Sequence, residues 1–111
     1  MKKIMVTKGL RGKVDPESYH KKCIAAVEKY YAGIGQPIEL TTCRGVSNSF
    51  DGSTANKRLV GLAGTIAHEV AVADEIVFMD DWQLYDGCVV EHLIAIRYGI
   101  PCLYLRSDAA Q

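Results

Sequence analysis

The chain of 111 residues has the length of one domain, and 49% of its residues are hydrophobic, which is enough to form a buried core. Thirteen basic and thirteen acidic residues give a formal net charge of zero, which argues against a protein that binds nucleic-acid polymers or membrane surfaces. We therefore expect a single domain over residues 1–111 that binds neither of these partners.

The cysteines and the apolar runs bear on compartment and metal binding. Four cysteines are spread along the chain with no CxxC pair and no His/Cys cluster, so we expect reduced thiols and no zinc site. No apolar run approaches the roughly 20 residues of a membrane-spanning helix. We therefore expect a cytoplasmic protein without metal or cofactor.

The first third of the chain predicts a strand, a helix and a second strand. An apolar run at residues 4–6 precedes a basic, glycine-containing loop. Asp15 can cap the helix that follows, and Pro16 suits its first turn. One face of this helix carries side chains at steps of four, four and three: Tyr19, Cys23, Val27 and Tyr30. Gly33 ends the helix, and residues 37–42 form the second strand.

The rest of the chain predicts a loop, then two helices that each precede a strand. Residues 43–56 lack any periodicity, which indicates a long loop. A helix face runs through residues 59–72, and the continuous apolar run at 76–79 is typical of a strand buried on both faces. A last helix over about residues 88–98 precedes a strand at 101–105.

This order predicts an α/β fold with a doubly wound parallel sheet of about four to five strands and helices on both faces, Rossmann-like or flavodoxin-like. Ligands of such sheets bind outside the carboxyl ends of the strands. Three loops reach that edge, at residues 7–14, 43–56 and 80–88. We therefore expect a binding site among these loops.

The stretch DDWQLYDGCVVEH, residues 80–92, gathers carboxylates in one of the three loops. Glu91 falls in the first turn of a helix that begins near Gly87, where the positive dipole end favours an ionised carboxylate. Such a carboxylate can act as a nucleophile, or it can simply stabilise the helix. Asp80 or Asp81 could supply a second carboxylate for glycosyl chemistry, although aspartates after a strand are also ordinary turn formers.

Other residues of these loops are candidates for ligand binding. Four of them could contact a phosphate, or belong to solvated loops: Lys8, Gly9, Arg11 and Arg44. Trp82 could stack on a base or a sugar, or pack over the edge of the core. Gly87 would allow a ligand to approach the backbone, or relieve a turn. Cys88 opens a helix, where the pKa of a thiol would fall, and its alternative role is that of a small packing residue.

Residues 73–105, ADEIVFMDDWQLYDGCVVEHLIAIRYGIPCLYL, resemble the nucleoside 2-deoxyribosyltransferase-like superfamily, and the resemblance is closest to its small phage and bacterial members. The matching positions are Ala73, Asp74, Trp82, Gly87, Glu91, His92, Ala95, Gly99 and Pro101. Enzymes of this family have a doubly wound α/β fold. They cleave the N-glycosidic bond of nucleosides or nucleotides through a glutamate nucleophile and pass the sugar to another base or to water.

The resemblance implies that Glu91 is the nucleophile, that Trp82 builds a wall of the pocket, and that Asp80 or Asp81 holds sugar hydroxyls. It also implies that Gly87 lets the chain approach the sugar or its phosphate. Tyr85 stands where the family often has a serine that binds a phosphate, and Lys8-Gly9 replaces its usual Gly-Pro pair. The 5′ group of the substrate is therefore left open.

Three functions remain as alternatives at this point. The first is an N-glycosidase or deoxyribosyltransferase, a hydrolase or transferase that uses Glu91 without a metal. The second is a binding protein that holds a nucleotide or nucleotide signal in the same cleft, and the third is a structural or interaction domain. Small members of the superfamily tend to form homo-oligomers, for which Tyr30-Tyr31 or the helix at residues 59–70 could supply an apolar face.

Overall fold

The structure of the protein, a computed structural model, describes residues 1–41 and 69–110. Its elements, in chain order, are β1 (Lys2–Thr7), α1 (Pro16–Gly33), β2 (Ile38–Thr41), β3 (Glu75–Phe78), the 3-10 helix η1 (Trp82–Leu84), α3 (Asp86–Tyr98), β4 (Cys102–Tyr104) and the 3-10 helix η2 (Ser107–Ala110). Residues 69–71 are also helical. The predicted loop at 43–56 and most of the predicted helix at 59–72 lie outside the described residues.

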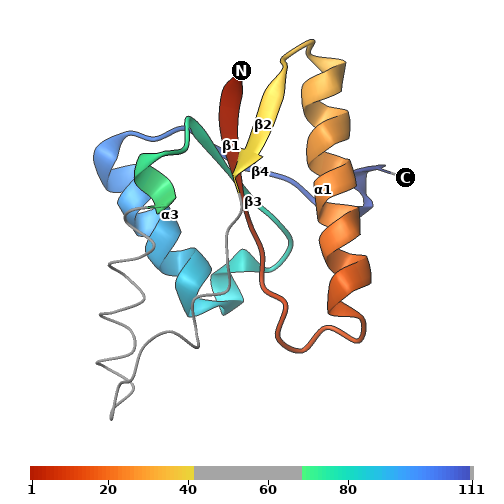
Figure 1. Cartoon of the computed structure of the whole chain (residues 1–111). Helices are drawn as coiled ribbons and strands as arrows, with labels where there is room; N and C mark the ends of the chain where they lie inside the picture. The colour runs from red at the N-terminus through yellow and green to blue at the C-terminus, as the bar shows by residue number, and fades with distance from the viewer. Residues whose placement is uncertain (42–68, 111) are drawn as a thin grey trace.

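The four described strands form one parallel sheet in the order β2-β1-β3-β4. The chain moves from β1 outward to β2, and then returns to the other side of β1 to form β3. Because parallel crossovers are right-handed, this reversal puts α1 on one face of the sheet and α3 on the other, as Figure 1 shows. The prediction of a doubly wound parallel α/β fold is confirmed.

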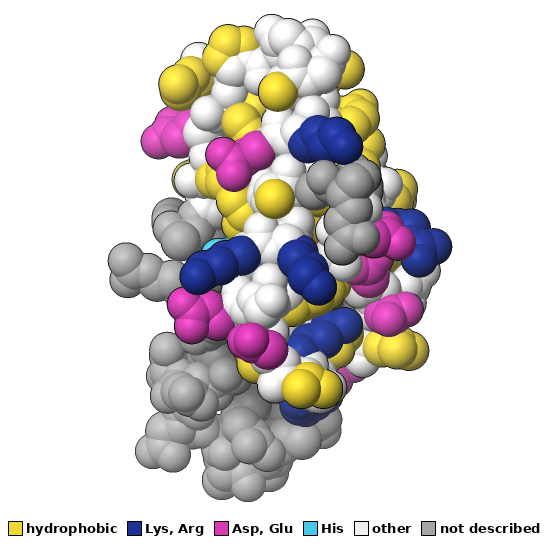
Figure 2. Space-filling model, turned by 90° about the vertical axis from the view of Figure 1, so that its right-hand side faces the viewer, with side chains coloured by type: hydrophobic (Ala, Val, Ile, Leu, Met, Phe, Trp, Pro, Cys, Tyr) yellow, Lys and Arg dark blue, Asp and Glu magenta, His cyan; other side chains and the backbone are white. Residues whose placement is uncertain are grey.

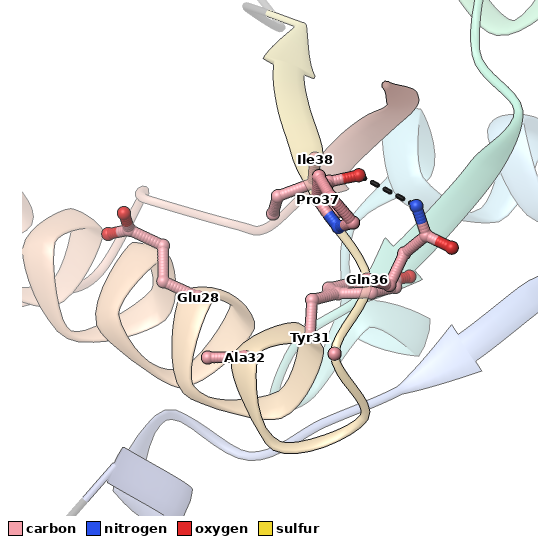
Figure 3. Close-up of a pocket in the computed structure, with 7 residues that line it drawn as sticks. Glu28, Tyr31, Ala32, Gln36, Pro37 and Ile38 are labelled. Carbon is pink, nitrogen blue, oxygen red and sulfur yellow. Dashed lines mark hydrogen bonds between the residues drawn. The ribbon is translucent and has the colours of Figure 1, made fainter.

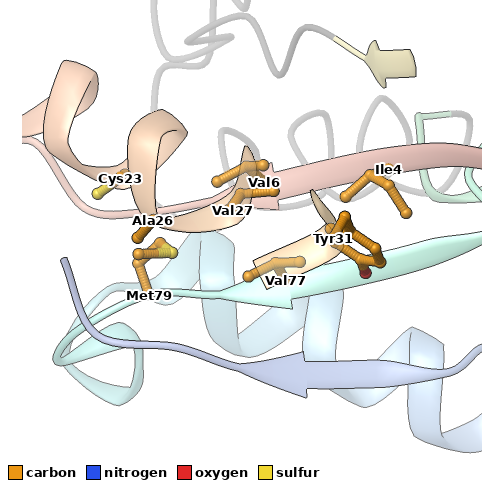
Figure 4. Packing of buried hydrophobic residues seen from close by; sticks show 8 residues of the cluster. All are labelled: Ile4, Val6, Cys23, Ala26, Val27, Tyr31, Val77 and Met79. Atoms are coloured by element: carbon orange, nitrogen blue, oxygen red, sulfur yellow. The ribbon is translucent and has the colours of Figure 1, made fainter. Parts of the chain in front are cut away.

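The core on the α1 face is formed by alternate strand residues and one side of the helix. Ile4, Val6, Val77 and Met79 point toward α1 because successive strand side chains lie on opposite faces. Helix α1 covers them with Cys23, Ala26, Val27 and Tyr31 (Figure 4).

The prediction that Tyr30 belongs to the buried face of α1 was wrong. Tyr31 is the buried residue, at 1% exposure, whereas Tyr30 is 38% exposed. Tyr31 follows Val27 by four positions and Tyr30 by three, and the hydroxyl of Tyr31 donates a hydrogen bond to Glu75 at 2.5 Å. The hydrogen bond to Glu75 on β3 therefore explains why Tyr31, rather than Tyr30, points into the core. Because Tyr31 is buried, it cannot contribute to an exposed apolar face for oligomerisation.

The opposite face has its own core. Met5, Ile76 and Phe78 point away from α1 and pack with Val70 and Ala95. The short helical segment that contains Val70 thus covers the same face as α3. No helix in residues 1–41 and 69–110 is long and apolar enough to cross a membrane.

The ends of the helices agree with the sequence signals. The side chain of Asp15 caps α1 by accepting a hydrogen bond from the Ser18 amide at 3.1 Å. Gly99 ends α3 with a left-handed backbone, φ 73°, which glycine adopts without strain. Helix α3 begins at Asp86, two residues before the predicted start, and neither of the two 3-10 helices was predicted.

Candidate functional site

The candidate site lies where β1 and β3 end side by side. Thr7 is the last residue of β1, and it is paired with Phe78 on β3. The hydroxyl of Thr7 lies 3.2 Å from the thiol of Cys88 in the first turn of α3, and both residues are buried. This contact ties the carboxyl end of the central strand to the helix that follows the neighbouring strand. The strand order reverses between β1 and β3, which is the place where such sheets bind ligands.

Glu91 lies one turn after Cys88 and therefore on the same face of α3. It is only 3% exposed, and its negative charge acts to raise the pKa of the Cys88 thiol, so its carboxylate lies within electrostatic range of the sulfur. The prediction that Glu91 falls in the first turn was wrong, because α3 begins at Asp86 and Glu91 is its sixth residue. The surroundings of the Glu91 carboxylate are therefore those of a buried side chain, not those of a helix N-terminus.

The expected fall in the pKa of Cys88 was also wrong. Burial raises the pKa of this thiol, and the charge of Glu91 adds to the rise; the hydrogen bond with Thr7 and the charge of Lys8 act in the opposite direction. Desolvation therefore outweighs the position of the cysteine near a helix N-terminus. The burial of the thiol and its raised pKa fit the alternative role of Cys88 as a small packing residue.

The loop after β1 closes against the start of α3. The phenol of Tyr85 donates a hydrogen bond to the backbone carbonyl of Arg11 at 2.8 Å. Its ring covers Gly9 so closely that a Cβ atom at position 9 would lie 2.1 Å from a ring carbon. Gly9 is therefore required for this contact, and its contact with a phosphate stays a prediction. Tyr85 thus joins the loops that follow β1 and β3.

Positive charge lies at the same edge. The ammonium group of Lys8 acts to lower the pKa of both Cys23 on α1 and Cys88 on α3, so its charge acts on both helices. Arg11 is exposed on the outer part of the loop. Gly87 is half-buried in the first turn of α3, and Arg44 lies outside the described residues.

The two aspartates predicted as helpers have different surroundings. Asp80 accepts hydrogen bonds from the Tyr19 hydroxyl at 3.2 Å and from the Ser107 amide at 3.0 Å. Burial acts to raise the pKa of Asp80, but the hydrogen bonds from Ser107 and Tyr19, with the nearby cation of Arg106, hold it below its usual value. These partners lie on α1 and η2, on the face opposite α3, whereas Cys88 and Glu91 belong to α3.

Asp81 is exposed and adopts a left-handed backbone, φ 56°, before the 3-10 helix η1. Trp82 packs in an aromatic cluster with Phe78, His92 and Tyr104, at centroid distances of 5.1, 4.3 and 6.0 Å. This is the packing over the core edge that the sequence offered as the alternative to stacking on a ligand. The cluster covers β3 and β4, whereas Cys88 covers the end of β1.

The structure thus brings Lys8, Gly9, Tyr85, Cys88 and Glu91 to one edge of the sheet. It connects Asp80 to the other face and Trp82 to the β4 side. Sequence reasoning missed Thr7, whose hydroxyl contacts the thiol of Cys88. The sequence signal that could have identified Thr7 is a polar residue directly after the apolar run at residues 4–6.

Two other kinds of site received no support. Among the described residues, no group of three or more His, Cys, Asp and Glu side chains could hold a metal ion.

An open hollow of about 430 Å³ lies between the end of α1 and the start of β2, lined by residues that include Glu28, Tyr31 and Gln36 (Figure 3). It lies at the amino edge of the sheet, away from Glu91, and Gln36 bonds there to the carbonyl of Pro37.

Comparisons of the chain with protein-family models, with curated proteins and with solved structures found no match.

Proposed function

We propose that the protein is a nucleoside or nucleotide N-glycosidase or deoxyribosyltransferase in which Glu91 attacks the sugar. One observation carries this proposal: the acidic side chain of Glu91 is only 3% exposed and lies one helical turn from Cys88, whose thiol contacts Thr7 at the switch point of the parallel sheet. Glutamate is almost never buried to this extent unless it serves a partner or a function. The resemblance of residues 73–105 to the deoxyribosyltransferase-like superfamily supports the same residue.

In the proposed reaction, a carboxylate oxygen of Glu91 forms a bond to the anomeric carbon. The bond from that carbon to the base nitrogen breaks, and the base departs with the electron pair and takes up a proton. A water molecule or a second base then attacks the glycosyl-enzyme and releases Glu91 as a carboxylate. No metal is required in either step.

The positive charges of Lys8 and Arg11 would favour a substrate with a phosphate. The ring of Tyr85, however, occupies the space over Gly9 in the same loop, which leaves less room for that phosphate. A substrate panel therefore includes both nucleosides and their 5′-monophosphates, in ribose and deoxyribose forms. Free base is separated by chromatography after incubation with the full chain. We expect base release from at least one member of the panel.

The Glu91→Gln variant tests the role of the nucleophile, because it keeps the size of the side chain and removes its charge. We expect base release to fall by about 1,000-fold or more, as for the loss of other nucleophiles. Glu28→Gln makes the same chemical change at an exposed position of α1 and should leave the rate unchanged. Release that survives in Glu91→Gln would overturn the mechanism.

A second candidate is a protein that binds a nucleotide without cleaving it. The observation that favours it is the engagement of Asp80 by Tyr19 and Ser107, since this aspartate was the candidate second carboxylate. Titration calorimetry with the same panel separates the two functions. Heat of binding without free base supports the binding protein, and free base supports the enzyme.

We also propose that the protein works in the cytoplasm on a small-molecule partner. The described cysteines, Cys23, Cys88 and Cys102, form no disulfide, which supports a reducing compartment.

A further inference from the structure

Helix α3 limits the directions in which a sugar can extend from Glu91. Ala95 lies one turn after Glu91 on the same face of the helix, where it is fully buried and packs with Met5 and Phe78. In the other direction lies Tyr85, the residue just before the helix, about 9 Å from Glu91 along the helix axis. A sugar whose anomeric carbon lies at Glu91 therefore extends its 5′ end toward Tyr85.

The loop after β1 holds the side chain of Tyr85 through both its ring and its hydroxyl. The ring packs on the buried Gly9 so closely that a Cβ atom at position 9 would lie 2.1 Å from a ring carbon. The hydroxyl donates a hydrogen bond to the carbonyl of Arg11 at 2.8 Å. Tyr85 therefore forms a fixed wall at the place where the 5′ end of the sugar arrives.

This wall is unsuited to a phosphate. Loops that bind phosphate use glycines, because a residue without a side chain lets backbone N–H groups approach the anion. Here the ring of Tyr85 covers Gly9 with carbon atoms, which donate no hydrogen bond. The exposed carboxylate of Asp86, the next residue, also repels an anion. These two features oppose the positive charges of Lys8 and Arg11.

The oxygen of Tyr85 suits a hydroxyl group instead. Its proton is used in the hydrogen bond to Arg11, so toward a substrate this oxygen can only accept. A 5′-hydroxyl can donate to it. A 5′-phosphate is mostly fully ionised at neutral pH, since its second pKa is about 6, and it then has acceptors alone.

Charges on the α1 side of the molecule do not favour one sign. Figure 2, which views this side, shows basic and acidic side chains spread over it. The exposed charged residues of α1 are Glu17, Lys21, Lys22, Glu28 and Lys29. A neutral and an anionic substrate are therefore distinguished by the residues around Tyr85, and not by the charge of this surface.

We propose that Tyr85 selects substrates with a free 5′-hydroxyl, so that nucleosides are cleaved in preference to nucleoside 5′-monophosphates. This selectivity rests on the proposed reaction at Glu91, because it concerns the substrate of that reaction. The ring of Tyr85 keeps a phosphate away from Gly9, and its oxygen binds the hydroxyl. A site that hydrogen-bonds a hydroxyl strongly rejects an analogue that cannot form the bond.

The ratio of kcat/KM for each nucleoside to that for its own 5′-monophosphate tests the proposal. We expect a ratio of about 100 or more in wild type, and a ratio near or below about 1 in Tyr85→Ala, which uncovers Gly9 beside Lys8 and Arg11. Tyr98→Ala is the matched control, since Tyr98 is 77% exposed at the end of α3, and it should keep the wild-type ratio. Circular dichroism verifies that each variant is folded.

Tyr85→Phe separates the hydrogen bond from the bulk of the ring. It keeps the ring over Gly9 and removes the acceptor, so kcat/KM for nucleosides should fall by about 10-fold while monophosphates stay poor substrates. Wild-type ratios in both Tyr85→Ala and Tyr85→Phe would overturn the proposal.

The same panel distinguishes a failure of this proposal from a failure of the proposed reaction. Wild-type protein that cleaves monophosphates as fast as nucleosides would overturn the role of Tyr85 and leave that of Glu91 intact. Where no base is released, titration calorimetry gives the ratio of affinities, and a preference for nucleosides that disappears in Tyr85→Ala supports the role of Tyr85 alone. A chain that neither binds nor cleaves any member of the panel would overturn both proposals.

Discussion

Asp80, just after β3, accepts hydrogen bonds from η2 and α1. The substitution Asp80→Asn keeps the shape of the side chain but should weaken these hydrogen bonds. The carboxylate accepts from the Ser107 amide at 3.0 Å and the Tyr19 hydroxyl at 3.2 Å. Hydrogen bonds to a charged group contribute about 1.5–3 kcal/mol. Asp80 is partly exposed and asparagine retains one acceptor, so we expect a loss of about 1 kcal/mol, or about 5 °C in Tm for a domain of this size.

The effect should depend on pH in a defined direction. The pKa of Asp80 is lower in the folded protein than its ordinary value, so its charge stabilises the fold above about pH 4. This stabilisation is lost as the pH falls through the folded pKa. The difference between wild type and Asp80→Asn, measured by urea denaturation, should therefore be largest at neutral pH and decline toward zero in acid.

Asp81→Asn is the control for this experiment. Its side chain makes no hydrogen bond in the described part of the chain, and asparagine tolerates the left-handed backbone at this position. We expect its free energy of unfolding to lie within about 0.5 kcal/mol of wild type. An equal loss in Asp81→Asn, or a loss in Asp80→Asn that persists in acid, would refute the reasoning.

Two further predictions concern the contacts at the edge of the sheet. Gly9→Ala should cost about 1–3 kcal/mol because its Cβ would lie 2.1 Å from the Tyr85 ring. Most of that cost should disappear in a Tyr85→Ala background, and a cost that persists would place the strain in the backbone instead. In native protein, iodoacetamide should modify Cys102 before Cys88, as followed by mass spectrometry. Burial raises the pKa of both thiols, but Cys88 is buried whereas Cys102 is only half-buried, so the reagent reaches Cys102 more easily. The opposite order would show that the site opens in solution.

Local signals were sufficient for the order of the described strands and α-helices and for one helix start. Asp15 and Pro16 act within a single turn, so the start of α1 could be read from neighbouring residues. The alternation of strands and helices then fixed the parallel sheet, because right-handed crossovers leave few other arrangements. The approximate position of the candidate site followed from the same rule.

Contacts between distant residues could not be read in this way. The partners of Asp80 are 61 and 27 positions away, so its connection to α1 and η2 has no local signal. Tyr31 rather than Tyr30 is buried because Glu75 accepts its hydrogen bond from across the fold. Cys88 has a helix-terminal position that favours a low pKa, but tertiary burial reverses the shift.

The proposed reaction requires that Glu91 form a bond to the sugar of a nucleoside. A nucleoside with fluorine at the 2′ position slows release of the glycosyl-enzyme and allows it to accumulate, so intact-protein and peptide mass spectrometry can detect it. We predict a mass increase of one fluorinated sugar, located on the peptide that contains Glu91 and absent from Glu91→Gln. Base release from this probe with the sugar attached to another residue, or an adduct that persists in Glu91→Gln, would contradict the account.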